Sequence, residues 1–129
     1  ENNKTISLGS ISPKRDLTYV LDTCKGFLSI YNCDQLFGLV TNIGMNKSIT
    51  IGELVSNIAD TIGTEIKIKT DEKRIRPDAS EVVELHCNNS RLISKTDWSP
   101  DYSLNKGILE TIKWVKTNKD YFKTDVYNV

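Results

Sequence analysis

The sequence predicts an α/β fold with small strands and about four helices. Residues 4–9 and 65–69 alternate polar and apolar side chains, which is typical of strands with two different faces. Two other segments begin at Thr50 and Ser103 and repeat apolar residues every three or four positions, which is typical of amphipathic helices. Strand and helix patterns therefore follow one another along the chain, as they do in α/β domains.

The first part of the chain predicts two strands separated by a turn. In residues 4–9, Ile6 and Leu8 fall on one face, so this strand is expected to be half-buried. Pro13 predicts a turn because it fixes its own φ angle. Residues 17–20 then contain Thr, Tyr and Val, which favour a pleated strand.

A helix and a buried strand are expected next. Asp22 stands where a helix N-cap is wanted, ahead of a helical pattern over residues 22–32. The pattern places Phe27, Ile30 and Tyr31 on one stripe, which is expected to be buried. Residues 38–44 form a compact apolar run that ends in glycine, so they are predicted to form a fully buried parallel strand.

The clearest helix signal lies in residues 50–63. Thr50 and Glu53 have the spacing of a capping box, and Gly63 is expected to end the helix. Its apolar stripe consists of Leu54, Ile58 and Ile62.

The last third begins with a charged, irregular loop over residues 71–82. A short strand at residues 82–85 and a short helix at residues 89–96 are expected to follow it. Trp98 is expected to pack in the interior, and Ser103 is expected to cap the final helix. One face of that helix carries Leu104, Ile108, Thr111, Ile112 and Val115.

Composition and charge narrow the possible functions. The 17 basic and 17 acidic residues cancel, which argues against a nucleic-acid or membrane-surface partner. No apolar run is long enough to span a bilayer, and no signal peptide is expected at the start of the chain. The three cysteines, Cys24, Cys33 and Cys87, lack zinc spacing and are expected to be reduced thiols of a cytoplasmic protein. His86, the single histidine, is expected to bond to a backbone carbonyl at a strand end.

The phrase Pro13-Lys14-Arg15-Asp16-Leu17-Thr18-Tyr19-Val20-x-Asp22 resembles the arginine-aspartate strand of the extended short-chain dehydrogenase/reductase family, the NAD-dependent epimerases and dehydratases. Four more stretches resemble the family in order and spacing, so that the resemblance covers nearly the whole chain. They are residues 41–44, residues 49–54, the phrase Arg74-Ile75-Arg76-Pro77-x-x-Ser80-Glu81-Val82, and the tail at residues 121–129. Within the family, the chain is most similar to nucleotide-sugar 4,6-dehydratases of the legionaminic-acid-pathway type.

The resemblance implies that residues 1–129 are the C-terminal, substrate-binding portion of a Rossmann-type enzyme whose N-terminal NAD(P)-binding part is absent. The chain has no glycine-rich turn after a strand, so no cofactor is expected to bind to it, although the parent enzyme would use NAD or NADP. No catalytic residue is expected either. Tyr102 and Lys106 have the spacing of the family's Tyr-x-x-x-Lys pair, but they lie far from the place where the family carries it.

Two arginines are expected to hold the diphosphate of a nucleotide-sugar. By resemblance these are Arg15, next to the first turn, and Arg76, in the Arg-Pro loop, since the planar guanidinium matches phosphate oxygens. From the residues alone, Arg15 could instead pair with Asp16 or another surface carboxylate. Arg74 is expected to be a solvated surface charge.

Three further residues are implied as substrate contacts. Glu81 would either accept a ribose hydroxyl or buttress Arg76, and the buttress is preferred. Leu8 lies where the nucleotide base would stack, or it belongs to a plain edge strand. Lys47 follows the Asn-Ile-Gly stretch and either contacts the substrate or is solvated.

The functional prediction is the nucleotide-sugar-binding part of an NAD(P)-dependent 4,6-dehydratase acting on a UDP- or GDP-N-acetylhexosamine. The parent enzyme is expected to be a cytoplasmic homodimer. A 4-epimerase or a decarboxylase of the same family is the alternative within the enzyme class. A non-catalytic binding module is the alternative from another class.

Overall fold

The computed structural model describes residues 4–77 and 80–122, and all structural statements refer to these. The first three residues, Asp78, Ala79, and residues 123–129 of the predicted tail lie outside them. The described elements are β1 (Lys4–Leu8), β2 (Lys14–Asp16), α1 (Val20–Tyr31), β3 (Ser48–Thr50), α2 (Ile51–Ile62), β4 (Ile66–Thr70), β5 (Glu84–Leu85), α3 (Ser90–Lys95) and α4 (Leu104–Thr117).

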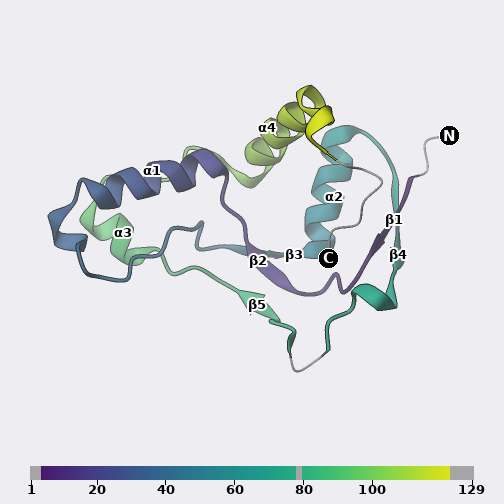
Figure 1. The fold of residues 1–129 in the computed structure, drawn as a ribbon, viewed down its shortest axis with the longest axis horizontal. Helices are drawn as coiled ribbons and strands as arrows, with labels where there is room; N and C mark the ends of the chain where they lie inside the picture. The colour runs from purple at the N-terminus through teal and green to yellow at the C-terminus, as the bar shows by residue number, and fades with distance from the viewer. Residues whose placement is uncertain (1–3, 78–79, 123–129) are drawn as a thin grey trace.

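These strands form two small sheets. β1 and β4 pair in parallel, with Ile6 opposite Ile68. In the second sheet β2 is the central strand, antiparallel to β3 and parallel to β5. Figure 1 shows β1 and β4 at one end of the molecule, α1 and α3 at the other, and the three-stranded sheet between them. The predicted α/β fold with small strands and four helices is therefore confirmed for the described residues.

The helix with the clearest sequence signal forms as expected. The Glu53 backbone N–H donates to the Thr50 hydroxyl at 3.0 Å, and the Thr50 N–H donates to the Glu53 carboxylate at 2.8 Å. Both bonds satisfy N–H groups that have no partner within a helix, which is the purpose of a capping box. The helix ends at Gly63, whose φ of 72° lies in the left-handed region that glycine tolerates.

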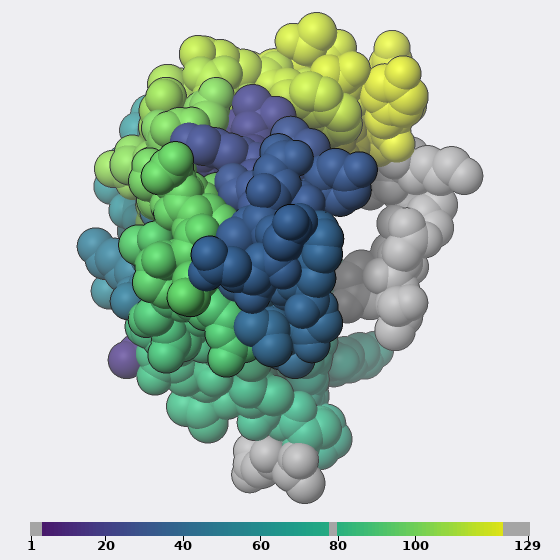
Figure 2. All heavy atoms as spheres, turned by 90° about the vertical axis from the view of Figure 1, so that its left-hand side faces the viewer, coloured from purple at the N-terminus to yellow at the C-terminus, as the bar shows by residue number. Residues whose placement is uncertain are grey.

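The buried core lies between α1 and α3. Leu36, Leu92 and Trp98 are almost completely buried, and Ile30, Cys33 and Ile43 pack against them. Figure 2 shows this end of the molecule, where α1 and α3 lie side by side. The predicted packing role of Trp98 is confirmed by its exposed fraction of 2%.

The predicted buried stripe of the first helix is confirmed only at Ile30, which packs against the core. Phe27 and Tyr31 are 64% and 75% exposed, whereas the buried positions in α1 are Asp22 and Gly26. A Cβ at Gly26 would lie 2.7 Å from Ile43, so the missing side chain lets the helix approach residues 41–43 closely. The helix therefore buries the face that begins at Asp22, about 100° away from the most apolar face.

The start of that helix also differs from the prediction. The strand occupies Lys14–Asp16 rather than residues 17–20, and α1 begins at Val20 with Tyr19 at its N-cap position. Asp22 is therefore no N-cap but lies buried in the first turn, where the helix dipole favours a carboxylate.

The predicted strand at residues 38–44 does not form. The segment is irregular, and Leu39 and Val40 are 53% and 81% exposed. A strand needs a neighbour to receive its backbone hydrogen bonds, and no described strand pairs with this segment.

Candidate functional site

Arg15 is fixed in the middle of the three-stranded sheet. It lies opposite Ile49 of β3 and Leu85 of β5. Its Nη1 donates hydrogen bonds to the backbone oxygens of Lys14 at 2.7 Å and Val82 at 2.9 Å. Three hydrogen bonds in all, the third to a carboxylate, hold the guanidinium in one orientation.

That carboxylate belongs to Glu81. Arg15 Nη2 donates to Glu81 Oε1 at 3.3 Å, and the two side chains are 22% and 21% exposed. Glu81 was expected to buttress Arg76, but the described residues contain no hydrogen bond between these two side chains. The structure therefore brings Arg15 and Glu81 together, and Asp16 is not the carboxylate that pairs with Arg15.

Asp16 has a different function, which the sequence did not indicate. Its Oδ1 accepts from the Met45 backbone N–H at 2.8 Å, and its Oδ2 accepts from the N–H groups of Lys47 and Cys87, both at 3.2 Å. One carboxylate thus fastens β2 to the loop before β3 and to the segment after β5. Asp16 and Arg15 are neighbours in the strand, so their side chains point to opposite faces of the sheet and have different partners.

Lys47 is positioned by its backbone rather than by its side chain. Its N–H is bound to Asp16, while the residue itself is exposed. Its position near the sheet is therefore fixed, whereas a substrate contact of the ammonium group stays a prediction.

Leu8 is the last residue of β1 and is half-buried. Its carbonyl oxygen accepts from the Asp71 N–H at 2.8 Å, which ties the end of β1 to the loop after β4. The neighbouring Gly9 is required there, because a Cβ would lie 2.3 Å from the Arg74 carbonyl oxygen. Leu8 therefore belongs to an edge of the two-stranded sheet, and base stacking on it stays a prediction.

Arg74 is not the solvated charge that the sequence predicted. Its Nε donates to the Asp71 carboxylate at 3.1 Å, and its Nη1 donates to the Ser7 backbone oxygen at 3.2 Å. Arg74 therefore fastens its loop to β1. Arg76, two residues on, is exposed and makes no hydrogen bond or ion pair with any described residue.

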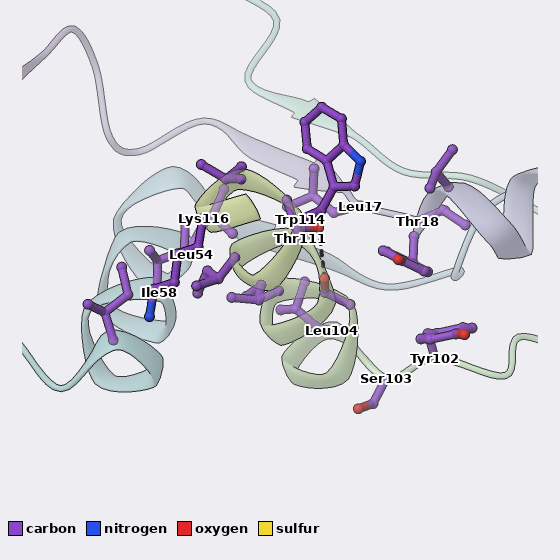
Figure 3. A pocket seen from close by; sticks show the side chains of 17 residues that line it. Leu17, Thr18, Leu54, Ile58, Tyr102, Ser103, Leu104, Thr111, Trp114 and Lys116 are labelled. Atoms are coloured by element: carbon purple, nitrogen blue, oxygen red, sulfur yellow. Dashed lines mark hydrogen bonds between the residues drawn. The ribbon is translucent and has the colours of Figure 1, made fainter. Parts of the chain in front are cut away.

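The described part of the chain has two cavities to consider as a binding site. The larger, of about 880 Å³, is an apolar groove between α2 and α4, lined among others by Leu54, Ile58 and Leu104 (Figure 3). The smaller, of about 530 Å³, is lined by Asp16, Thr23, Phe27, Thr41, Asn42, Ile43, Leu85, His86 and Cys87. Neither cavity is lined by a predicted substrate residue, but the smaller one is lined by Asp16, the neighbour of Arg15 in β2. The polar groups of β2 and the segments beside it are therefore the better candidate site, although the apolar groove is larger.

The ionisable groups near β2 have modified acidities. The Ser48 hydroxyl donates to Glu84 and lowers the pKa of that carboxyl below its usual value. Burial, together with the Asp16 carboxylate, raises the pKa of the Cys87 thiol. His86 Nε2 lies 2.9 Å from the side-chain oxygen of Asn46, so its partner is an amide side chain and not the expected backbone carbonyl.

Three further observations on the described residues concern metal binding, the Tyr102–Lys106 pair and membrane-spanning helices. The described residues contain no group of three His, Cys, Asp or Glu side chains that could hold a metal ion. Lys106 Nζ lies 4.1 Å above the centre of the Tyr102 ring, so these two residues meet at the ring face and not at the hydroxyl. None of the helices in the described part of the chain combines the length and hydropathy needed to cross a bilayer.

Comparisons with known proteins place the chain in a family. The family described as GDP-mannose 4,6 dehydratase matches residues 1–111. The probable GDP-L-fucose synthase 1 of Oryza sativa subsp. japonica is 29% identical over 85% of this chain, and the match covers 32% of that protein. The UDP-glucuronate 4-epimerase of Thermodesulfobacterium geofontis is 24% identical over 90% of this chain and 34% of its own length.

A solved structure agrees with these relatives. The dTDP-glucose 4,6-dehydratase of Bacillus anthracis, in complex with NAD, superposes with a TM-score of 0.76 at 27% identity, over 93% of this chain and 37% of that one. The chain thus spans about a third of the length of the proteins that it matches. It belongs to the GDP-mannose 4,6 dehydratase family, within the NAD-dependent epimerases and dehydratases.

Proposed function

We propose that this chain is the nucleotide-sugar-binding portion of an NAD(P)-dependent nucleotide-sugar 4,6-dehydratase, and that Arg15 and Arg76 bind the substrate diphosphate. The observation that carries the proposal is the orientation of Arg15, which three hydrogen bonds hold at the centre of a sheet. Related proteins act on GDP- and UDP-linked sugars by name, which supports this class of substrate. A UDP- or GDP-N-acetylhexosamine is the substrate that we propose.

The test is a calorimetric titration of UDP and of GDP into the protein and its arginine variants. A charge-assisted hydrogen bond contributes about 1.5–3 kcal/mol, so Arg15→Ala and Arg76→Ala should each weaken binding by about one to two orders of magnitude. Lysine lacks the two-pronged donor, so Arg15→Lys should recover only part of the loss. Unchanged affinity in both alanine variants would refute the proposal.

The control must remove one positive charge without disturbing the fold. Arg74 is unsuitable because it fastens its loop to β1. Lys67 is suitable, since it is exposed on β4 and no described residue bonds to its side chain. Lys67→Ala should bind UDP and GDP as the parent chain does.

The described residues lack the glycine-rich turn that is typical of a nicotinamide cofactor site. Such a site needs a glycine-rich turn between a strand and a helix, which brings the backbone close to the pyrophosphate. The three strand-to-helix junctions of the described residues, from β2 to α1, from β3 to α2 and from β5 to α3, contain no glycine-rich turn. We propose that NAD or NADP binds to a part of the enzyme outside this chain. The chain alone should therefore convert no UDP-N-acetylglucosamine to a 4-keto product when NAD is supplied.

A second structural feature supports a missing part. An apolar region on α1 and the segment after it is exposed; it consists of Val20, Leu21, Phe27, Leu28, Tyr31, Phe37, Leu39 and Val40. Exposed apolar regions of this extent mark interaction surfaces. We propose that the remaining part of the enzyme covers this region. Sedimentation should accordingly reveal association of the isolated chain that decreases in a Phe27→Ser, Val40→Ser variant, whereas a stable monomer at all concentrations would contradict this proposal.

A 4-epimerase is the second candidate, because a UDP-glucuronate 4-epimerase matches 90% of this chain. Both activities require the same diphosphate contacts, so titration does not separate them. Product analysis with the complete enzyme does, since a dehydratase releases a 4-keto-6-deoxy sugar and an epimerase releases a sugar inverted at C4.

A further inference from the structure

The Arg15 guanidinium keeps one pair of donors for a ligand. Arginine carries five N–H groups in a planar arrangement. Both N–H groups of Nη1 are bound, to the oxygens of Lys14 and Val82, and one N–H of Nη2 is bound to Glu81. The N–H of Nε and the second N–H of Nη2 have no acceptor among the described residues. An N–H of Nε and an N–H of Nη2 that lie on the same edge of the guanidinium can donate to two oxygens of one phosphate.

Glu81 is itself held in a fixed position beside β2. The Lys14 N–H donates to the Val83 oxygen at 2.8 Å, and the Val82 oxygen accepts from Arg15. The next residues form β5, which pairs in parallel with β2. The segment that carries Glu81 is therefore attached to the strand that carries Arg15.

We infer that Glu81 is a positioning residue, which orients Arg15 so that its two remaining donors face the substrate diphosphate. This inference rests on the proposed function. It differs from a ribose contact, because Glu81 acts here through Arg15 and touches no part of the ligand. A long arginine side chain that must be ordered during binding loses rotamer entropy, and Glu81 removes that cost in advance.

Two substitutions of Glu81 distinguish the effect of its hydrogen bond to Arg15 from the effect of its negative charge. Glu81→Ala removes the hydrogen bond, so the affinity for UDP and GDP should fall about three- to tenfold, as expected for one side chain that must be ordered on binding. Glu81→Gln keeps an acceptor oxygen for Nη2 and should restore most of the lost affinity. Glu84→Gln is the matched control: Glu84 lies three residues on, bonds to Ser48, and should not change binding.

A second ligand distinguishes the inference from a ribose contact. Inorganic pyrophosphate has no ribose, so a positioning role predicts that Glu81→Ala weakens its binding by the same factor as that of the nucleoside diphosphate. A loss confined to the nucleoside diphosphate would overturn the inference. Tighter binding in both Glu81 variants would also overturn it, because Glu81 would then compete with the phosphate.

A measurement without ligand tests the positioning directly. The Nε–H group of Arg15, assigned by its loss in Arg15→Lys, should give a sharp nuclear magnetic resonance signal in the parent chain and in Glu81→Gln, and a broadened one in Glu81→Ala. An unchanged signal in Glu81→Ala would overturn the inference. If the parent chain binds neither UDP, GDP nor pyrophosphate, the proposed function fails, and the signal still decides whether Glu81 orients Arg15.

Discussion

Replacing Asp22 by alanine should remove a large fraction of the free energy of unfolding of this chain. The Asp22 side chain is 1% exposed and accepts hydrogen bonds from the backbone N–H groups of Asp101 at 2.9 Å and Tyr102 at 3.1 Å. Its backbone oxygen also accepts from the Trp98 indole at 3.0 Å. Asp22 thus joins α1 to the segment that leads into α4.

The magnitude follows from these two carboxylate bonds. Each hydrogen bond to a charged group contributes about 1.5–3 kcal/mol, so the loss of two in Asp22→Ala should reduce the free energy of unfolding by about 3–6 kcal/mol. Domains are typically stable by about 5–15 kcal/mol, so this is a large fraction. Asp22→Asn keeps one acceptor oxygen but places its NH₂ group against the second backbone N–H. This substitution should reduce the free energy of unfolding by about 2 kcal/mol.

Urea unfolding, followed by the fluorescence of the buried Trp98, measures these changes. The control is Asp101→Asn, which removes an exposed ion pair with Lys25; because the side chains are 39% and 57% exposed, it should cost less than about 1 kcal/mol. A loss below about 1 kcal/mol in Asp22→Ala, with an unchanged denaturant slope, would show that the two N–H groups find other acceptors and would refute the reasoning.

Three further predictions concern packing, pH and thiol reactivity. Gly44→Ala should destabilise the fold by about 1–3 kcal/mol in urea unfolding, because the new Cβ would lie 2.4 Å from the Cys87 Cβ. Hydrogen bonds from Thr50 lower the pKa of Glu53, so the capping box stabilises the fold above the ordinary carboxyl pKa and loses this effect as the pH falls through the lowered value. Thr50→Ala should therefore destabilise the fold more at neutral pH than in acid, and equal losses of melting temperature at the two pH values would contradict this. Iodoacetamide should modify the exposed Cys24 faster than Cys87, whose thiol pKa is raised by burial and by Asp16; equal rates by mass spectrometry would contradict it.

The sequence by itself determined the elements whose signals are local. The capping box and terminal glycine of α2, the alternating pattern of β1 and β4, and the Ser103 cap of α4 all depend on residues within a few positions of one another. Such signals act through backbone hydrogen bonds that form inside the segment or at its ends. The family could also be predicted from the sequence, because the motif around Arg15 is a single continuous stretch of residues.

Only the tertiary structure decided which partners the charged residues have. Arg15 and Glu81 are 66 positions apart, Asp16 and Cys87 are 71 apart, and Asp22 and Tyr102 are 80 apart. No periodicity links such positions, so the sequence could name Arg15 and Glu81 but not pair them. The buried face of α1 was also undecidable from its pattern, because the close approach of Ile43 to Gly26, rather than the most apolar stripe, sets how that helix packs. Contacts between segments that are distant in sequence depend on complementary shape and on hydrogen-bonding groups that still need a partner. Both are defined only when the chain has folded.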